Sequence, residues 1–108
     1  MNSDNFLRSK FVVGQLVFHK LMNEKAVIFD VDPYFSKDDD WYQEMATNQP
    51  AKKQPWYHVL VNNTLNCAYV AEENLAMPPD KEPILHPQIF DYFTSYYDGY
   101  YRLKMLAN

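Results

Sequence analysis

Residues 56–75 read WYHVLVNNTLNCAYVAEENL, and this stretch decides the fold class. Its first six residues are mostly aromatic or β-branched and follow Pro55, so residues 56–61 are predicted to form a strand. Asparagine tolerates positive φ, and the two asparagines at 62–63 therefore predict a hairpin turn. Residues 65–71 return as the next strand. Residues 72–75 predict a single helical turn that holds its last residue, a leucine, against the core.

Two further strands are predicted upstream of this hairpin. Residues 11–18 (FVVGQLVF) are mostly apolar, and Gly14 within them indicates a bulge or a close approach of another backbone segment. Residues 25–31 form the second predicted strand, which Pro33 ends. Alternation along this strand predicts one face with Val27, Phe29 and Val31 and an opposite face with Ala26, Ile28 and Asp30.

Two helical segments are expected outside the strands. The first follows a polar run in which Ser36 or Asp38 can cap a helix of about two turns. The second opens at His86-Pro87, because proline suits the first helical position. Apolar residues then recur at three-to-four spacing through residues 89–97, and Gly99 ends the pattern.

Together these elements predict a mainly β fold, a small SH3-like, partly open barrel with one short helix and a C-terminal helical segment. We expect strand 56–61 to be central and segment 86–97 to pack across the barrel. A chain of 108 residues and 12.8 kDa has room for one domain. The expected organisation is a flexible N-terminus at residues 1–10, a single domain at 11–104 and a short tail at 105–108.

Composition excludes several classes of protein. Two glycines are too few for the Gly-rich loops that bind nucleotide phosphates. One cysteine cannot form an internal disulfide, which suits a reducing compartment. The sequence shows neither a signal peptide nor an apolar run long enough to span a membrane. We therefore expect a cytoplasmic protein without membrane contact.

The charge balance bears on nucleic acid as a partner. Ten basic and fourteen acidic residues give a net charge of −4, and residues 26–108 hold six basic against twelve acidic side chains. Proteins that bind nucleic acids usually carry a basic face, because neutralising phosphates supplies most of their affinity. Charge alone therefore argues against this partner. If DNA is bound, the residues expected to contact phosphate are Arg8, Lys10, Lys20, Lys52 and Lys53.

The acidic residues between 30 and 40 do not form a calcium-binding EF-hand. A loop starting at Asp30 would need glycine and glutamate where this chain has Phe35 and Trp41. We interpret the acidic run as a strand end and a helix cap, and the histidines as structural. We expect neither a metal nor a cofactor. The spacing of a zinc motif is absent from the histidines, which are His19, His58 and His86.

Residues for nucleophilic catalysis do not come together in the sequence pattern. Cys67 and His58 could be cross-strand neighbours in the predicted hairpin. However, Cys67 lies within a strand, without a glycine-rich elbow or a helix start to lower the thiol pKa. We interpret it as a buried, inert thiol and expect a protein without enzymatic activity.

Aromatic residues are unusually abundant, at 18 of 108. A small barrel cannot bury all of them, so several are expected on the surface, where they favour contacts with partner proteins or stacking on bases. For any single aromatic, a place in the core or in an oligomer contact is the simpler interpretation. The candidate partner-binding residues form two sets, Trp41, Tyr42, Trp56 and Tyr57 around the loop at 50–55, and Tyr96, Tyr97, Tyr100 and Tyr101 near the C-terminus.

Several motifs across residues 11–101 occur together in one known family. The N-terminal motifs are Gly14-Gln15, then His19, then VIFDVDP at residues 27–33. The later motifs are Trp41-Tyr42, QPWYHVLV at 54–61, AYVAEENL at 68–75, His86-Pro87, Phe93 and Asp98-Gly99 followed by Tyr101. In this combination the chain resembles the HspQ family, which is also described as the YccV-like hemimethylated DNA-binding domain. One departure is Lys25-Ala26, where the family usually has Arg-Gly.

This resemblance implies an SH3-like barrel, a cytoplasmic bacterial heat-shock protein without enzymatic activity, and a homo-oligomer with a trimer favoured. The family is described as binding hemimethylated DNA and as promoting the degradation of denatured proteins, including a replication initiator, by cellular proteases. Acidic charge and displayed aromatics suit a surface for partly unfolded proteins. We therefore expect a non-enzymatic adaptor that acts during stress between denatured client proteins and an ATP-dependent protease. The alternative is a hemimethylated DNA-binding protein.

Overall fold

A computed structural model of the chain describes residues 8–105. The elements in chain order are β1 (Leu16–His19), β2 (Glu24–Asp32), α1 (Asp39–Met45), β3 (Trp56–Val61), β4 (Cys67–Ala71), a 3₁₀ turn (Glu72–Asn74), β5 (Leu75–Ala76), α2 (Ile89–Tyr92), β6 (Phe93–Tyr97) and β7 (Tyr100–Leu103). Residues 1–7 of the predicted flexible N-terminus and residues 106–108 of the predicted tail lie outside the described residues.

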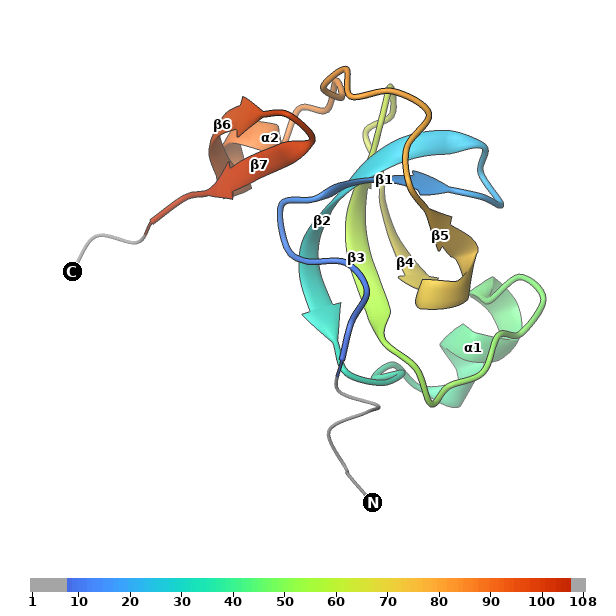
Figure 1. Cartoon of the computed structure of the whole chain (residues 1–108). Coiled ribbons are helices and arrows are strands. Elements are labelled where there is room, and N and C mark those ends of the chain that lie inside the picture. The colour runs from blue at the N-terminus through green and yellow to red at the C-terminus, as the bar shows by residue number, and fades with distance from the viewer. Residues whose placement is uncertain (1–7, 106–108) are drawn as a thin grey trace.

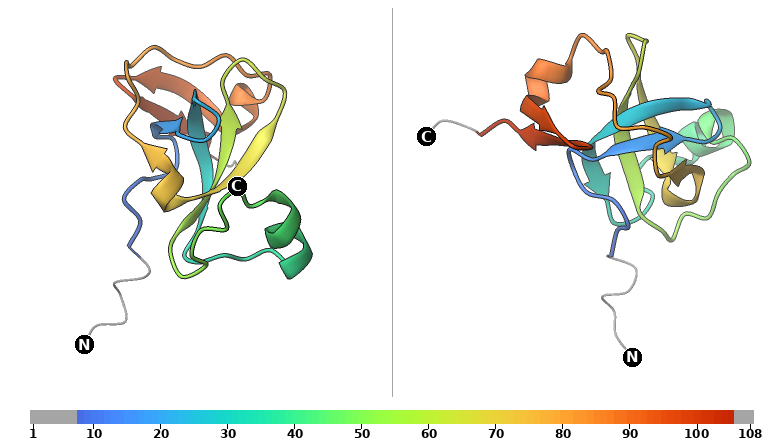
Figure 2. Two further views of the ribbon diagram at one scale, coloured as in Figure 1. Left: turned by 90° about the vertical axis from the view of Figure 1, so that its right-hand side faces the viewer. Right: turned by 45° about the horizontal axis from the view of Figure 1, so that its top comes forward.

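The strands form a curled five-stranded sheet, with a small two-stranded sheet beside it (Figures 1 and 2). The larger sheet has the order β4-β3-β2-β1-β5 with antiparallel neighbours, and β6 pairs with β7. This architecture confirms the prediction of a mainly β fold and is compatible with a small SH3-like barrel. Strand β3 has the predicted bounds and lies inside the sheet, although β2 occupies the middle position.

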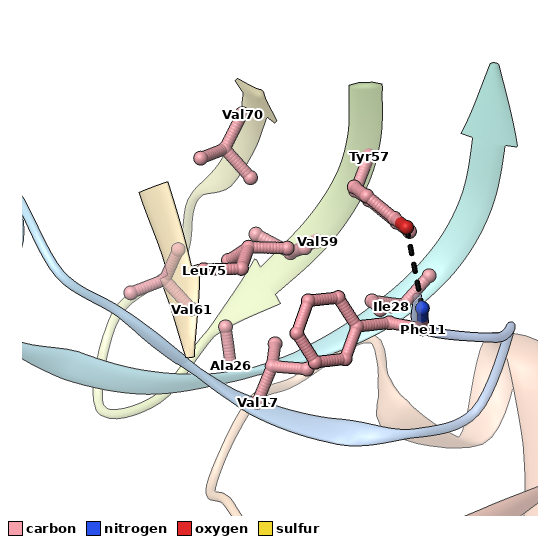
Figure 3. Packing of buried hydrophobic residues seen from close by; sticks show 9 residues of the cluster. All are labelled: Phe11, Val17, Ala26, Ile28, Tyr57, Val59, Val61, Val70 and Leu75. Atoms are coloured by element: carbon pink, nitrogen blue, oxygen red, sulfur yellow. Dashed lines mark hydrogen bonds between the residues drawn. The ribbon is translucent and has the colours of Figure 1, made fainter. Parts of the chain in front are cut away.

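The concave face of the sheet encloses the first part of the core (Figure 3). Its side chains come from β1 to β5 and from the segment that precedes β1. They are buried, and most are aliphatic, which is the pattern expected for the inner face of a barrel. The residues of this cluster are Phe11, Val17, Ala26, Ile28, Tyr57, Val59, Val61, Val70 and Leu75.

Tyr57 anchors the N-terminal segment to this core. Its hydroxyl donates to Glu72 Oε2 at 2.6 Å and accepts from the Phe11 N–H at 3.3 Å, while the Lys10 N–H reaches the same Glu72 oxygen at 2.8 Å. Burial, together with the hydrogen bond to the Glu72 carboxylate, raises the pKa of Tyr57 above its ordinary value. Tyr57 is fully buried, so its proposed place on a partner-binding surface is wrong.

A β-bulge at Phe29 changes the faces predicted for β2. Ile28 pairs with Val59, but the next pair is Asp30 with His58, so Phe29 is the extra residue. Beyond the bulge the alternation is shifted by one position. Val31 therefore packs with the inner cluster and Asp30 points to the convex face, the reverse of the prediction.

The C-terminal segment forms a hairpin where a longer helix was predicted. Helix α2 ends at Tyr92, and β6 and β7 follow, joined by Asp98 and Gly99, which both have positive φ (50° and 94°). An Asp-Gly pair of this kind is typical of a two-residue hairpin turn. The three-to-four spacing of the aromatic residues is compatible both with a helix and with a strand of irregular register. The turn at Asp98-Gly99 favours the strand.

The hairpin packs on the convex face of the large sheet. Leu16, Val27 and Leu60 of the sheet contact residues of the C-terminal unit, which are Ile84, Ile89, Phe93 and Tyr101. Gly14 joins the two parts, because its N–H donates to the Ile28 carbonyl and its own carbonyl accepts from the Tyr101 N–H, both at 2.7 Å. The predicted close backbone approach at Gly14 is confirmed, although β1 begins only at Leu16.

Candidate functional site

An open groove runs along the free edge of the sheet at β4, with a volume of about 730 Å³. One wall is the turn between β1 and β2, the other is α1, and the floor comes from β4. The side chains that give the groove its exposed apolar character are Leu21, Met22 and Met45. Half-buried Trp41 and Tyr69 extend the same surface.

Local sequence explains how α1 forms this wall. The Asp38 side chain accepts from the Trp41 N–H at 2.9 Å and caps the helix, as predicted for Asp38. The helix then turns Trp41 and Tyr42 toward the barrel, and the Tyr42 hydroxyl donates to the Pro50 carbonyl at 2.8 Å. Met45, predicted on the same face as Trp41, is 61% exposed and overhangs the groove.

Trp56 lies beneath this wall at the centre of an aromatic cluster. Its ring centroid is 5.0 Å from that of Phe35 and 5.3 Å from that of Tyr69. Only 1% of Trp56 is exposed, so it holds α1 to the sheet from inside and is not displayed as proposed. The Lys37 ammonium lies 5.0 Å from the Tyr69 ring, which places a cation over the outer side of the cluster.

The second set of tyrosines divides between core and surface. Tyr101 is buried and accepts the Ile84 N–H at its hydroxyl, so it is not available to a partner. Tyr96 is half-buried, and its hydroxyl donates to the Lys81 carbonyl. Tyr97 is 84% exposed and Tyr100 is also exposed, both next to the hairpin turn. Of these four tyrosines, Tyr97 and Tyr100 are the exposed ones, and neither lines the groove.

Cys67 and His58 do not form a nucleophile–base pair. Cys67 is exposed, contrary to the prediction of a buried thiol, because β4 lies at the edge of the sheet. His58 pairs across the strands with Tyr69, and its Nε2 lies 3.2 Å from Asp32 Oδ2. Partial desolvation of the Cys67 thiol raises its pKa, which disfavours the reactive thiolate.

Residues 8–105 include one group of three potential metal ligands, Asp30, Asp32 and His58.

A family model described as hemimethylated DNA-binding protein YccV like matches residues 9–100. The match spans most of the chain, including the large sheet, the groove and β6, and ends at the first residue of β7. The chain belongs to this family. The resemblance to the YccV-like domain, predicted from the sequence motifs, is therefore confirmed.

The basic residues considered for DNA contact are all exposed in this YccV-like fold. Backbone contacts place them around the acidic 3₁₀ turn: the Lys10 N–H bonds Glu72, and the Lys20 N–H bonds the Asn74 carbonyl. Lys52 is paired with Asp39 at 2.8 Å. Carboxylates thus interrupt the basic surface, to which Arg8 and Lys53 contribute further exposed charges.

The exposed apolar residues of the groove are not among the candidates named from the sequence. Leu21 and Met22 lie in the short turn between β1 and β2, and two large apolar residues in such a turn are a signal of an exposed contact surface. Lys37 could not be identified as a groove residue from the sequence, because its place over the Tyr69 ring depends on the packing of α1.

No helix among residues 8–105 is long and apolar enough to cross a membrane.

Proposed function

We propose that this YccV-like chain is a non-enzymatic adaptor that holds denatured client proteins in the groove along β4 and presents them to an ATP-dependent protease. The observation that carries the proposal is the free edge of β4 beside exposed Leu21, Met22 and Met45. The stress-linked and cytoplasmic setting, and the link to proteolysis, come from the resemblance to the HspQ family.

An edge strand suits a partner that is extended and unfolded. Backbone N–H and C=O groups on the outer side of an edge strand can pair with an added strand, whatever its sequence. The apolar walls then favour clients that expose apolar side chains. Such a site would recognise denatured proteins in general, because the backbone supplies the pairing and the methionine side chains adapt to different shapes.

A double substitution, Met22→Asp with Met45→Asp, tests the groove. We expect at least a tenfold loss of client affinity, since two apolar contacts of roughly 1.5 kcal/mol each are replaced by charge. The measurement is degradation of a fluorescently labelled, denatured client by an ATP-dependent protease, with and without this protein. The matched control is Leu65→Asp, whose side chain is exposed but lies outside the groove. Equal stimulation by both variants would contradict the proposed site.

Hemimethylated DNA is the second candidate partner, favoured by the description of the matching family. Binding would use the exposed lysines around the 3₁₀ turn, where Lys20 and Lys53 are the test positions. Labelled hemimethylated and fully methylated duplexes are titrated at two salt concentrations. The prediction is that Lys20→Gln with Lys53→Gln reduces the slope of log affinity against log salt by about 0.9 for each lost phosphate contact. Lys81→Gln, on the far side near Asp98, is the control. Negligible binding of both duplexes at low salt would exclude this candidate.

We further propose that the adaptor is a homo-oligomer, with a trimer favoured by the resemblance. The C-terminal unit exposes the large apolar side chains of Phe90, Tyr97 and Leu103, and such side chains favour contact with another copy of the chain. Sedimentation at micromolar concentration is expected to give a species heavier than the 12.8 kDa monomer. A single species of monomer mass would contradict this prediction.

A further inference from the structure

The bulge in β2 creates a cluster of polar side chains, one of which, His58, also lines the groove. Asp30 and Asp32 lie on the convex face, and His58 lies opposite Asp30 on β3. One donor atom from each residue lies within 4.8 Å of the other two. Without the extra residue at Phe29, Asp30 would share the face of Ile28 and point into the core. The cluster therefore depends on a specific irregularity of the strand.

The geometry of the cluster approaches that of a tetrahedral metal site. Ligand atoms about 2.0–2.1 Å from a zinc ion are roughly 3.3 Å from one another. The distance from His58 Nε2 to Asp32 Oδ2 is 3.2 Å, so these two atoms already have this separation. Asp30 is exposed and can rotate its carboxylate to complete the third position.

Neighbouring groups hold two of the ligands in place. The Tyr69 hydroxyl donates to Asp32 Oδ2 at 2.8 Å, which orients that carboxylate. The His58 ring lies between Tyr69 and Phe29, with centroid distances of 4.6 and 5.8 Å. Contacts of this kind, which fix the ligands before the ion arrives, strengthen metal sites.

The two carboxylates of the cluster carry negative charge that favours binding of a cation. The side chains of His58 and Asp32 are only 26% and 24% exposed and are paired with each other, and the exposed Asp30 carboxylate adds a second negative charge beside them. Among residues 8–105, the ion pairs of lysine and arginine involve other acids, so neither Asp30 nor Asp32 has a basic partner from those residue types. A divalent ion would balance both carboxylates. The imidazole favours zinc over calcium or magnesium, which prefer oxygen ligands alone.

We propose that Asp30, Asp32 and His58 bind a Zn²⁺ ion, with the remaining coordination position open to solvent. This proposal departs from the expectation of no metal, because the fold brings His58 to the two aspartates, a proximity that the sequence spacing does not reveal. An open position allows a donor atom of another molecule to join the site.

Isothermal titration of the full chain with Zn²⁺ tests this proposal, with Co²⁺ absorption as a second readout of coordination. We expect one ion per chain and at least a tenfold weaker affinity in Asp30→Asn and in His58→Gln. His86→Gln and Asp98→Asn are matched controls outside the cluster and should bind as the wild type does. Asp30 is exposed, so its variant should keep the fold, which circular dichroism verifies.

Tyr69→Phe gives an independent readout. Loss of its hydrogen bond to Asp32 should weaken zinc binding by roughly 10-fold while leaving all three ligands present. Absence of Zn²⁺ binding by the wild type would overturn the proposal. Unchanged affinity in both Asp30→Asn and His58→Gln would also overturn it, because the ion would then be held elsewhere.

Discussion

Replacing Gly14 by alanine is expected to destabilise the protein by about 3–5 kcal/mol. Gly14 has a φ of +91°, which alanine adopts only with strain, and an added Cβ would lie 2.2 Å from the Tyr101 carbonyl oxygen. The backbone of β7 would have to move away. That movement breaks the hydrogen bond from the Tyr101 N–H to the Gly14 carbonyl and loosens the hairpin from the sheet. Urea denaturation followed by circular dichroism measures the loss.

Gly99→Ala separates the two causes of this effect. Gly99 has nearly the same φ, +94°, but an added Cβ would meet only the Lys81 side chain, at 3.9 Å. Its cost is therefore expected to be the backbone strain alone, roughly 1–2 kcal/mol. Equal costs for the two variants would show that the close contact with Tyr101 does not limit stability, and would contradict the role given to Gly14.

Much of the large sheet could be predicted from short-range patterns. Residues 56–61 combine β-forming side chains with a proline before them and asparagines after them, so local preference and tertiary environment agree. Gly14 also carried its own signal, because glycine inside an apolar strand indicates close backbone contact. Asp38 was identifiable as a helix cap from its position before Trp41.

Two predictions of the fold were wrong, the side-chain faces of β2 and the helix over residues 93–97, and both depend on how a strand pairs with its neighbour. The bulge at Phe29 arises from the pairing of β2 with β3, so it cannot be predicted from the side chain of Phe29 alone. Residues 93–97 satisfied a helical spacing, but the Asp98-Gly99 turn and the docking surface of the sheet select a strand. In both cases the neighbouring strand decides which side chains share a face.

The candidate site was harder to predict, because aromatic residues serve both cores and surfaces. Trp56 and Tyr97 were equivalent as candidates in the sequence, yet one is buried and the other is almost fully exposed. The alternation of β3 would place Trp56 on the convex face, and only the packing of α1 over that face buries it. The groove likewise depends on α1, so its walls could not be assembled from strand patterns alone.

Trp56→Ala should therefore act on stability before it acts on any partner. Removing a buried tryptophan leaves a cavity, and the expected cost is about 3–5 kcal/mol. The loss comes from contacts with Phe35 and Tyr69 and from the hydrogen bond that Trp56 Nε1 donates to the Ala51 carbonyl at 3.3 Å. Unfolding of wild type and variant in urea, monitored by circular dichroism, gives the difference in free energy.

Tyr97→Ala is the control, since its ring is 84% exposed and its removal should change the free energy of unfolding by less than about 0.5 kcal/mol. The pair distinguishes a core role from a surface role for two residues that sequence alone treats alike. If Trp56→Ala kept wild-type stability but lost client degradation, Trp56 would be a contact residue after all. If it unfolds at lower urea and α1 loosens with it, Trp56 supports the groove from below. Client binding then falls because α1, which carries Trp41 and Met45, loses the support of Trp56.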